Sequence, residues 1–339
     1  GFDSSKWIQW VGNDDVKVAR ANIAVTVGVS GKDFTTVNAA IEYLSQFAPI
    51  YKKGGIIAEI KIEDGYILKE QLLFNGIDLS FIRISYEGSG YLKVDRDYLT
   101  ASFGGGYPVF GVGDGANSPQ LNLVFDCQVE QGSDVASDTK HGILVFRATA
   151  NMIGTAGAVN CSGVGVYCYT GNISGHSIVG SSNKTIGVYA LRGGEIKAQE
   201  IVGESDAYIG VHALAGHIHS GNLFGESTES IAIYSRSGTI SAYNMEATSI
   251  SGIGILCEAG SINGTNVNAK SDTSLVVYSL VGSIEGYTLN LENSEQSNEY
   301  LCAVASGGAI KSRYGTWTNN GSGNKCNVAA GTISSNGYV

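Results

Sequence analysis

Apolar and polar positions repeat along the chain with a period of about 22 residues, beginning near His141. A four-residue motif with apolar first and third positions marks each repeat. It occurs as Val164-Gly-Val-Tyr, Ile186-Gly-Val-Tyr, Ile209-Gly-Val-His, Ile231-Ala-Ile-Tyr, Ile253-Gly-Ile-Leu and Leu275-Val-Val-Tyr. A Gly-x-Ile signature recurs in phase at Gly171, Gly194, Gly216, Gly238, Gly260, Gly282, Gly308 and Gly331. Such a fixed period predicts one structural unit stacked many times.

Each repeat contains three short apolar runs with period-two alternation, separated by Gly, Ser, Asn and Thr. That alternation is typical of strands rather than helices. Three strands per coil predict an all-β fold, a right-handed parallel β-helix built as a single-stranded solenoid over residues 141–339. Leucine-rich repeats of similar length need a leucine framework that this sequence lacks. Coils should stack about 4.8 Å apart, and the column Asn222, Asn244 and Asn266 should be hydrogen-bonded from coil to coil.

The segment upstream of the repeats follows a different pattern. Apolar residues occur at helical spacing, namely Phe34, Val37, Ala40, Ile41, Leu44 and Phe47. Asp33 or Thr35 can cap the N-terminus of this helix, which should end before Pro49. Residues 56–62 and 77–84 alternate as strands. We therefore assign residues 31–140 to a capping helix with the first irregular coils, where the helix hides an unpaired strand edge. Residues 1–30 are assigned to a separate arm or connector.

Composition and charge exclude several classes of binding partner. The chain has 43% hydrophobic and 15% charged residues and a net charge of −10, which disfavours nucleic acid because phosphate binding needs clustered Lys and Arg. No stretch approaches about 18 apolar residues and no charged leader precedes an apolar core, so neither membrane insertion nor a signal peptide is expected. The six cysteines lack the C-x-x-C spacing of zinc sites. We expect no metal and no cofactor.

Two segments carry a family resemblance. The run Gly31-Lys-Asp-Phe-Thr-Thr-Val-Asn-Ala-Ala-Ile41, followed by Ile60-Lys-Ile-Glu-Asp-Gly-Tyr66, resembles the opening segment of pectate-lyase-like β-helices, particularly bacteriophage tailspikes. The resemblance covers about residues 25–110 by motif. It implies a capping helix and a homotrimeric protein of the virion tail, attached to the phage tail or baseplate through its N-terminus. The implied partner is a bacterial surface polysaccharide, capsule or lipopolysaccharide, which many tailspikes cleave.

The first strand of each coil predicts an aromatic surface. If its Ile and Val residues point inward, the intervening residues face outward. The outward column then contains Tyr167, Tyr189, His212, Tyr234, Leu256 and Tyr278, beside the small residues Gly165, Gly187, Gly210, Ala232 and Gly254. Aromatic rings flanked by small residues suit sugar rings, whose C–H faces stack on π systems. The same column could instead pack against a neighbouring subunit or stabilise the sheet by stacking.

The second strand concentrates ionisable side chains. Adjacent coils should place Glu195 beside His217 and Lys197 beside His219, about 5 Å apart. A carboxylate can tune an imidazole as a general base, and a cation can stabilise a developing enolate, which is what β-elimination on a uronic acid requires. A solvated, non-functional surface is the alternative interpretation.

The third run supplies a pair of acids. Glu204 and Glu226 are 22 residues apart and should lie one coil apart. A glycoside hydrolase needs two carboxyl groups about 5 to 9 Å apart, and stacked acids raise one another's pKa. The pair could equally bind a cation or simply repel in solvent.

These patterns together predict a phage tailspike that binds and depolymerises a bacterial surface polysaccharide during host adsorption. A non-catalytic receptor-binding protein or adhesin is one alternative, and a secreted bacterial polysaccharide lyase or esterase is another. The depolymerase interpretation assigns catalysis to the residues of the second and third runs, and glycan binding to Tyr167, Tyr189, His212, Tyr234 and Tyr278. Fold alone cannot choose among these functions.

Overall fold

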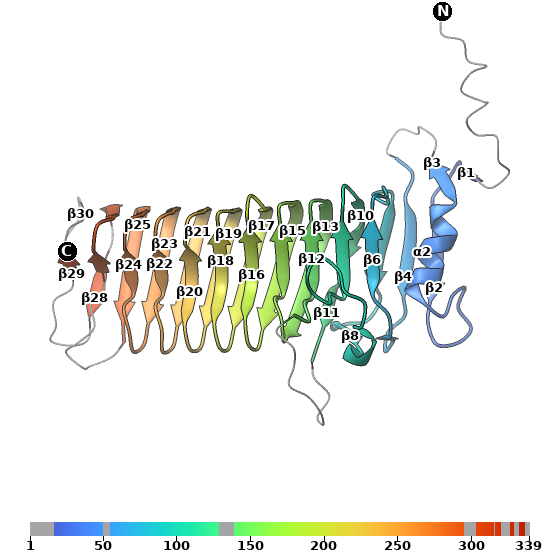
Figure 1. Ribbon diagram of the computed structural model, residues 1–339, viewed down its shortest axis with the longest axis horizontal. Helices are drawn as coiled ribbons and strands as arrows, with labels where there is room; N and C mark the ends of the chain where they lie inside the picture. The colour runs from blue at the N-terminus through green and yellow to red at the C-terminus, as the bar shows by residue number, and fades with distance from the viewer. Residues whose placement is uncertain are drawn as a thin grey trace, which may run out of the picture.

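The computed structural model describes residues 17–49, 55–128, 139–294, 303–314, 316–319, 326–328 and 332–335. Over these residues the chain forms a parallel β-solenoid of about 11 turns and of the right-handed β-helix type, stacked along the long axis of the molecule (Figure 1). The described helical elements are α2 (Val37–Ser45) and the 3-10 turn η1 (Arg96–Tyr98). The predicted all-β solenoid is confirmed.

An 11-stranded sheet forms one side of the solenoid, and we call it the short-strand sheet. Its strands, in order along the stack, are β6 (Leu72–Asn75), β9 (Phe110–Gly113), β12 (Ile143–Phe146), β14 (Val166–Tyr169), β16 (Ile186–Leu191), β18 (Ile209–Leu214), β20 (Ile231–Ser235), β22 (Ile255–Cys257), β24 (Val277–Ser279), β26 (Ala303–Ala305) and β29 (Cys326–Val328). Each strand pairs in parallel with its counterpart in the next coil.

The remaining sides belong to a 17-stranded sheet, the long-strand sheet. Its regular coils contribute 11-residue strands, namely β15 (Asn172–Ser182), β17 (Glu195–Ser205), β19 (His217–Ser227), β21 (Thr239–Ser249), β23 (Ser261–Ser271) and β25 (Ser283–Asn293). The earlier coils contribute β2 (Ile23–Val27), β4 (Ala58–Ile62), β5 (Ile67–Leu68), β7 (Ile82–Tyr86), β8 (Leu92–Val94), β10 (Asn117–Asn122), β11 (Val124–Asp126) and β13 (Thr149–Cys161). The last are β27 (Ala309–Tyr314), β28 (Trp317–Asn319) and β30 (Thr332–Ser335).

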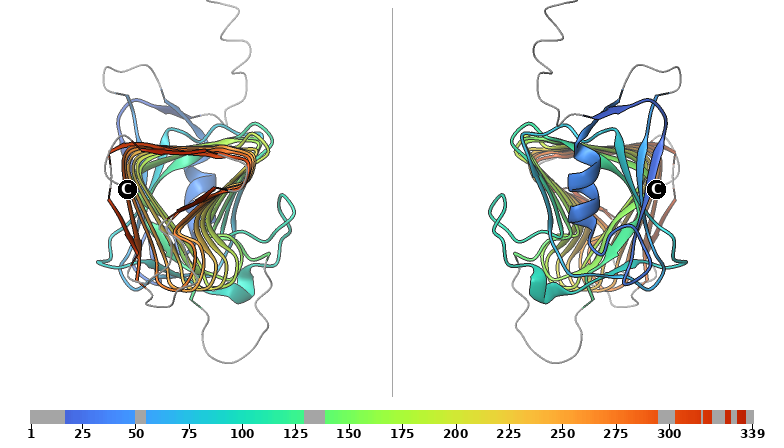
Figure 2. Two further views of the ribbon diagram at one scale, coloured as in Figure 1. Left: turned by 90° about the vertical axis from the view of Figure 1, so that its left-hand side faces the viewer. Right: turned by 90° about the vertical axis from the view of Figure 1, so that its right-hand side faces the viewer.

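Each regular coil has three sides but two strands, so the prediction of three strands per coil is wrong. The second and third predicted runs join into one long strand, because its hydrogen-bond ladder continues around a corner. Between β15 and β17, Gly175 pairs with Ala198 and Ser177 with Glu200, while the residue between them is skipped. This skipped residue marks the bend that divides the long strand into two halves, and the coil has a triangular cross-section (Figure 2).

The core lies inside the triangle and is filled by columns of apolar side chains. Seven of the eight isoleucines of the Gly-x-Ile signature are completely buried, namely Ile173, Ile196, Ile218, Ile240, Ile262, Ile284 and Ile310, and Ile333 is partly buried. Each such side chain contributes about 1.5–3 kcal/mol by leaving water. Because one coil alone would leave this column half exposed, stacking is what stabilises the fold.

The first residue of each four-residue motif does not point inward as predicted. Val164, Ile186 and Ile209 form a separate cluster on the outside, packed against the tyrosines. The pairing of β16 with β18 skips the glycine after each isoleucine, so the period-two alternation reverses there. That glycine faces inward instead: a Cβ on Gly210 would lie 2.5 Å from the carbonyl oxygen of Glu226.

Hydrogen bonds also link the coils through side chains. In the predicted asparagine column, Asn244 donates its amide N–H to Asn222 Oδ1 and Asn266 donates to Asn244 Oδ1, both at 2.8 Å. A column of buried serines lies where the long strands end. There Ser227 Oγ donates to the carbonyl of Tyr208 at 2.6 Å and accepts from the backbone N–H of Ser230 at 2.9 Å. The asparagine ladder is therefore confirmed.

The predicted helix is α2, although its cap differs from the prediction. Thr36 caps it by accepting a hydrogen bond from the N–H of Ala39, whereas Asp33 accepts from the N–H of Thr26 at 2.8 Å. α2 lies at the N-terminal end of the stack (Figures 1 and 2). It contributes Val37, Ala40, Ile41 and Leu44 to the main core.

The division of the N-terminal region needs a correction. Residues 1–30 were assigned to an arm, but β2 pairs with β4 and so belongs to the long-strand sheet. β1 (Lys17–Ala19) pairs with β3 (Phe47–Pro49) in a separate two-stranded sheet. Residues 1–16 lie outside the described part of the chain. Both principal sheets run without interruption from the irregular coils into the regular ones.

Candidate functional site

The aromatic column lies on the outer face of the short-strand sheet in the predicted order. Its six members, Tyr167, Tyr189, His212, Tyr234, Leu256 and Tyr278, pair with one another in successive strands. The ring centroids are 5.1 Å apart between Tyr167 and Tyr189, 4.8 Å between Tyr189 and His212, and 4.6 Å between His212 and Tyr234. The rings are stacked and nearly parallel, with interplanar angles of 10°, 8° and 8°.

This stacking changes what the column can bind. Tyr189 and His212 each have a ring on both faces, so a sugar can reach only their edges. His212 is 6% exposed and neither ring nitrogen has a hydrogen-bond partner among the described residues. Burial, with a smaller contribution from Arg236, lowers the pKa of His212 to about 4. Burial also raises the pKa of Tyr167 and Tyr189. Glycan binding by the column stays a prediction, and sugar-on-face stacking is unavailable at its centre.

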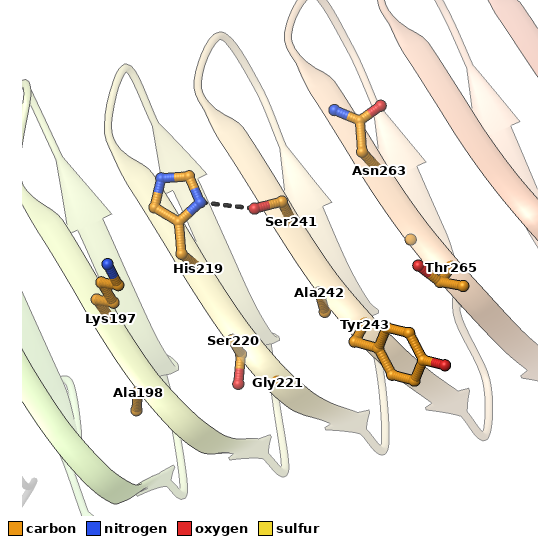
Figure 3. A pocket seen from close by; sticks show the side chains of 11 residues that line it. Lys197, Ala198, His219, Ser220, Gly221, Ser241, Ala242, Tyr243, Asn263 and Thr265 are labelled. Atoms are coloured by element: carbon orange, nitrogen blue, oxygen red, sulfur yellow. Dashed lines mark hydrogen bonds between the residues drawn. The ribbon is translucent and has the colours of Figure 1, made fainter.

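The ionisable residues of the second run are adjacent as predicted, yet they interact differently. Glu195 pairs with His217, and Lys197 with His219, in the register of β17 and β19. Among the described residues no hydrogen bond or ion pair joins Glu195 to His217. Nδ1 of His219 instead shares a 2.6 Å hydrogen bond with Oγ of Ser241 (Figure 3). The acid–imidazole contact on which the lyase hypothesis depends is not formed here.

Glu204 and Glu226 lie one coil apart near the ends of β17 and β19. Both side chains reach solvent. Partial desolvation raises the pKa of the Glu204 carboxyl, and the charges of Glu226 and Asp206 raise it further. A carboxyl that stays protonated beside an ionised one is the arrangement that acid/base catalysis on a glycosidic bond uses.

The three predicted sets do not form one site. The aromatic column belongs to the short-strand sheet, whereas Glu195 and Glu204 lie near opposite ends of the same long strand. The two acids are nine positions apart along the strand, a span of up to about 30 Å before the bend shortens it. The catalytic hypotheses are therefore separate alternatives.

A groove that the sequence analysis missed runs along the solenoid beside Lys197 and His219, and we call it the axial groove. Its first section, of about 570 Å³, is an open hollow above the bend of the long strands (Figure 3). It is lined by Lys197, Ala198, His219, Ser220, Gly221, Ser241, Ala242, Tyr243, Asn263, Gly264 and Thr265. Small residues form its floor because Ala198, Ser220, Ala242 and Gly264 pair in one column.

The groove continues toward the C-terminus. A second section of about 660 Å³ shares Asn263 and Gly264 with the first and extends to Ser334. One wall is the column Lys197, His219, Ser241, Asn263, Glu285 and Lys311. The other wall consists of the residues skipped at the bend, among them Tyr243 and Tyr287, which are 61% and 48% exposed. Within the described residues the ring of Tyr243 has no aromatic or cationic neighbour, whereas the ring of Tyr287 contacts Arg313 and Tyr314.

Tyr243 and Tyr287 had a signal in the sequence. They occupy the same position of the 22-residue repeat as Gly221 and Thr265. A model of strict inward–outward alternation gives the wrong direction for the side chain at this position, because the residue there is skipped in the pairing of the strands. Only when the bend is known can these tyrosines be assigned to a wall of the groove.

Within the described residues no group of three or more His, Cys, Asp or Glu side chains could hold a metal ion. No described helix is long and apolar enough to cross a membrane. A comparison with models of known protein families finds no match, and a comparison with curated protein sequences finds none either.

Proposed function

We propose that the protein recognises a bacterial surface polysaccharide as a phage tailspike does, holding the glycan chain along the axial groove. The observation that carries this proposal is the groove itself, which continues over successive coils with exposed tyrosines on one wall and hydrogen-bonding side chains on the other. Sugar rings stack their C–H faces on exposed aromatic rings while their hydroxyls bond to amide and hydroxyl groups.

The shape of the groove favours a linear polymer over a small ligand. Asn263 lies in both sections of the groove, so one occupant can pass from the first section to the second. The coils repeat about every 4.8 Å, and equivalent groups are therefore offered again at each step along the axis. A repeating ligand is the kind of molecule that uses such a surface.

The resemblance of residues 31–41 and 60–66 to tailspikes supplies the biological setting. We infer a homotrimer on the virion tail, attached through its N-terminus. We also infer that α2 closes the N-terminal end of the stack and keeps β2 from pairing with other chains, since its apolar face joins the main core. The half-buried outer edge of the aromatic column is where we infer a contact between subunits.

The test of glycan recognition uses a panel of encapsulated bacteria and their extracted polysaccharides. We expect the purified protein to bind at least one polysaccharide. Tyr243→Ala should weaken that binding about tenfold or more, corresponding to about 1.4 kcal/mol, because one exposed stacking surface is lost. Tyr208→Ala is the matched control. Tyr208 is also exposed, but it lies just before β18 and does not line the axial groove. Equal loss in both variants, or no loss in Tyr243→Ala, would contradict the groove as the site.

A second candidate function is cleavage of a glycan by Glu204 and Glu226, which lie outside the axial groove near the ends of β17 and β19. The specific observation is their pairing one coil apart, together with the raised pKa of Glu204. One carboxyl then donates a proton to the glycosidic oxygen while the other acts as base or nucleophile.

Glu204→Gln is expected to abolish the release of new reducing ends while leaving the affinity for the glycan unchanged. The amide cannot donate the proton, yet it preserves the shape of the side chain. Glu246→Gln is the control and should retain turnover. Glu246 lies on the same half of β21, the long strand that pairs with β19. If the wild-type protein binds without releasing any product, the non-catalytic receptor-binding alternative replaces the depolymerase. Ultraviolet absorbance from unsaturated uronates would instead indicate a lyase.

A further inference from the structure

The axial groove differs in charge from the molecule that carries it. The chain has a net charge of −10, whereas the only acidic side chain lining the described groove is Glu285, which forms an ion pair with Lys311 at 2.8 Å. Lys197 and Arg313 also line the groove, and neither forms an ion pair within the described residues. The groove is thus a basic strip on an acidic protein.

The N-terminal end of the groove is the first basic region. The Lys197 ammonium is exposed at the wall, with the imidazole of His219 one coil away (Figure 3). Glu195, the nearest acid along β17, precedes Lys197 by two residues and lies outside the groove lining. An exposed ammonium in a concave surface attracts anions more strongly than one on a flat surface, because the low-dielectric walls focus its field.

The C-terminal end is the second basic region, and its arginine is held in place. The guanidinium of Arg313 lies over the rings of Tyr287 and Tyr314, at 5.4 and 5.5 Å from their centroids. The two rings meet edge to face at 5.4 Å. Such cation–π contacts orient the guanidinium without neutralising it, so its N–H groups stay able to bind a carboxylate or phosphate.

The two basic regions are separated by several coils. From β17 to β27 the long-strand sheet takes five steps, which span about 24 Å at about 4.8 Å per step. The wall between them carries the uncharged Ser241 and Asn263, followed by Glu285, whose carboxylate is paired with Lys311. A ligand that satisfies both ends has negative groups spaced along a chain, with neutral units between them.

We infer that the glycan bound in the axial groove is anionic, a polysaccharide whose repeating unit carries a carboxylate or phosphate group. This inference rests on the proposed function and specifies its substrate class. The uncompensated cations at both ends recognise the charged groups, while Tyr243 and Tyr287 stack on the neutral sugars between them. A neutral glycan would leave two cations without a partner and gain nothing from them.

The experiment measures affinity for extracted capsular polysaccharides, sorted into those that contain uronic acid or phosphate and those that contain neither. Each acidic polymer is also tested after its carboxyl groups are reduced to alcohols or its phosphates are removed with hydrogen fluoride. We expect binding only to acidic polymers, a loss of about tenfold or more after the charge is removed, and weaker binding as salt rises from 20 to 300 mM.

Variants test the two basic regions directly. Lys197→Ala and Arg313→Gln should each weaken binding to the acidic polymer about tenfold and reduce its dependence on salt. Lys270→Ala is the matched control. Lys270 lies beyond the bend of β23, outside the axial groove, and forms an ion pair with Asp272 at 3.4 Å. The Lys270→Ala variant should therefore bind the acidic polymer as the wild type does. Circular dichroism and thermal unfolding confirm that each variant is folded.

The outcomes separate the inference from the function on which it rests. High affinity for a neutral polymer, or affinity that survives removal of the charged groups, overturns the inference and leaves glycan recognition standing. Binding to none of the polysaccharides, by a protein that is folded, overturns the proposed function itself.

Discussion

His212 is the one member of the aromatic column whose ordinary pKa, 6.5, lies near neutral pH. Its ring lies between Tyr189 and Tyr234, and both of its nitrogens lack hydrogen-bond partners among the described residues. The charged groups near it are the guanidinium of Arg236 and the carboxylate of Glu258, which forms an ion pair with Arg236 at 3.2 Å. A proton on this imidazole would be buried beside a cation, so the fold favours the neutral ring.

This burial makes stability depend on pH. The pKa of His212 is about 4 in the folded protein against an ordinary value of 6.5, so the unfolded chain binds more protons between these two values. Stability from this residue is therefore fully present above pH 6.5 and is lost as the pH falls toward 4. At pH 4 the loss is about 3 kcal/mol, since one pKa unit corresponds to about 1.4 kcal/mol.

His212→Phe keeps a ring in the stack and removes the titrating group. We expect urea unfolding to show a smaller loss of stability between pH 7 and pH 4 for this variant than for the wild type. His141, whose pKa burial also lowers to about 4, contributes equally to both proteins. His217→Phe, at an exposed position on the long-strand sheet, should behave as the wild type does. If stability depended on pH identically in His212→Phe and the wild type, the lowered pKa of His212 would not be a source of the pH dependence.

At the scale of elements, a buried serine fixes the length of the turn after each of four long strands. Ser205, Ser227, Ser249 and Ser271 each accept a backbone N–H from three residues later, and donate to a carbonyl of the preceding turn. One hydroxyl thus closes its own turn and ties that turn to its neighbour. A turn of different length would leave both backbone groups unpaired.

Ser227→Ala should destabilise the protein by about 1–3 kcal/mol, the usual cost of leaving buried polar groups without partners. Ser227 is completely buried and makes both bonds. The measurement is the midpoint of urea unfolding, compared with Ser237→Ala at an exposed position, which should change stability by less than about 0.5 kcal/mol. If Ser227→Ala unfolded at the same urea concentration as the wild type, water would be replacing the hydroxyl without loss of stability, and the prediction would be wrong.

At the scale of the whole molecule, stacking turns every repeat position into a line parallel to the axis. One such line is the aromatic column, and another pair of lines makes the two walls of the axial groove. These lines lie on different sides of the triangle, since one belongs to the short-strand sheet and the others to the long-strand sheet. A trimer can therefore use the side with the aromatic column and leave the groove open to the glycan.

We expect light scattering at micromolar concentration to give three times the mass of one chain. Tyr234→Arg, which puts a charge on the outer face of the short-strand sheet, should lower that mass if subunits meet there. Tyr243→Arg in the axial groove is the control and should leave the mass unchanged. A wild-type protein that runs as a monomer would remove the trimer from the proposal.

The 22-residue period was enough to predict the solenoid, and its columns fixed which residues are neighbours. The pairs Tyr189 with His212, Glu195 with His217 and Glu204 with Glu226 follow from spacing alone, because a parallel stack aligns equivalent positions. What spacing could not predict was where the period-two alternation breaks. Two of the errors, the inward assignment of Ile186 and the third strand per coil, arose at a residue skipped in the pairing.

The sequence by itself therefore determined the repeat, the order of every column and the buried isoleucines, since these depend on periodicity and on the removal of apolar side chains from water. Only the tertiary structure decided that the rings of the aromatic column cover one another. It also decided that His219 bonds to Ser241 and that, within the described residues, no hydrogen bond joins Glu195 to His217. The bend of the long strands, which places Tyr243 and Tyr287 beside a floor of small residues, likewise appears only in the tertiary structure. These outcomes depend on side-chain directions at the corners of the coil, and no local pattern in the chain records them.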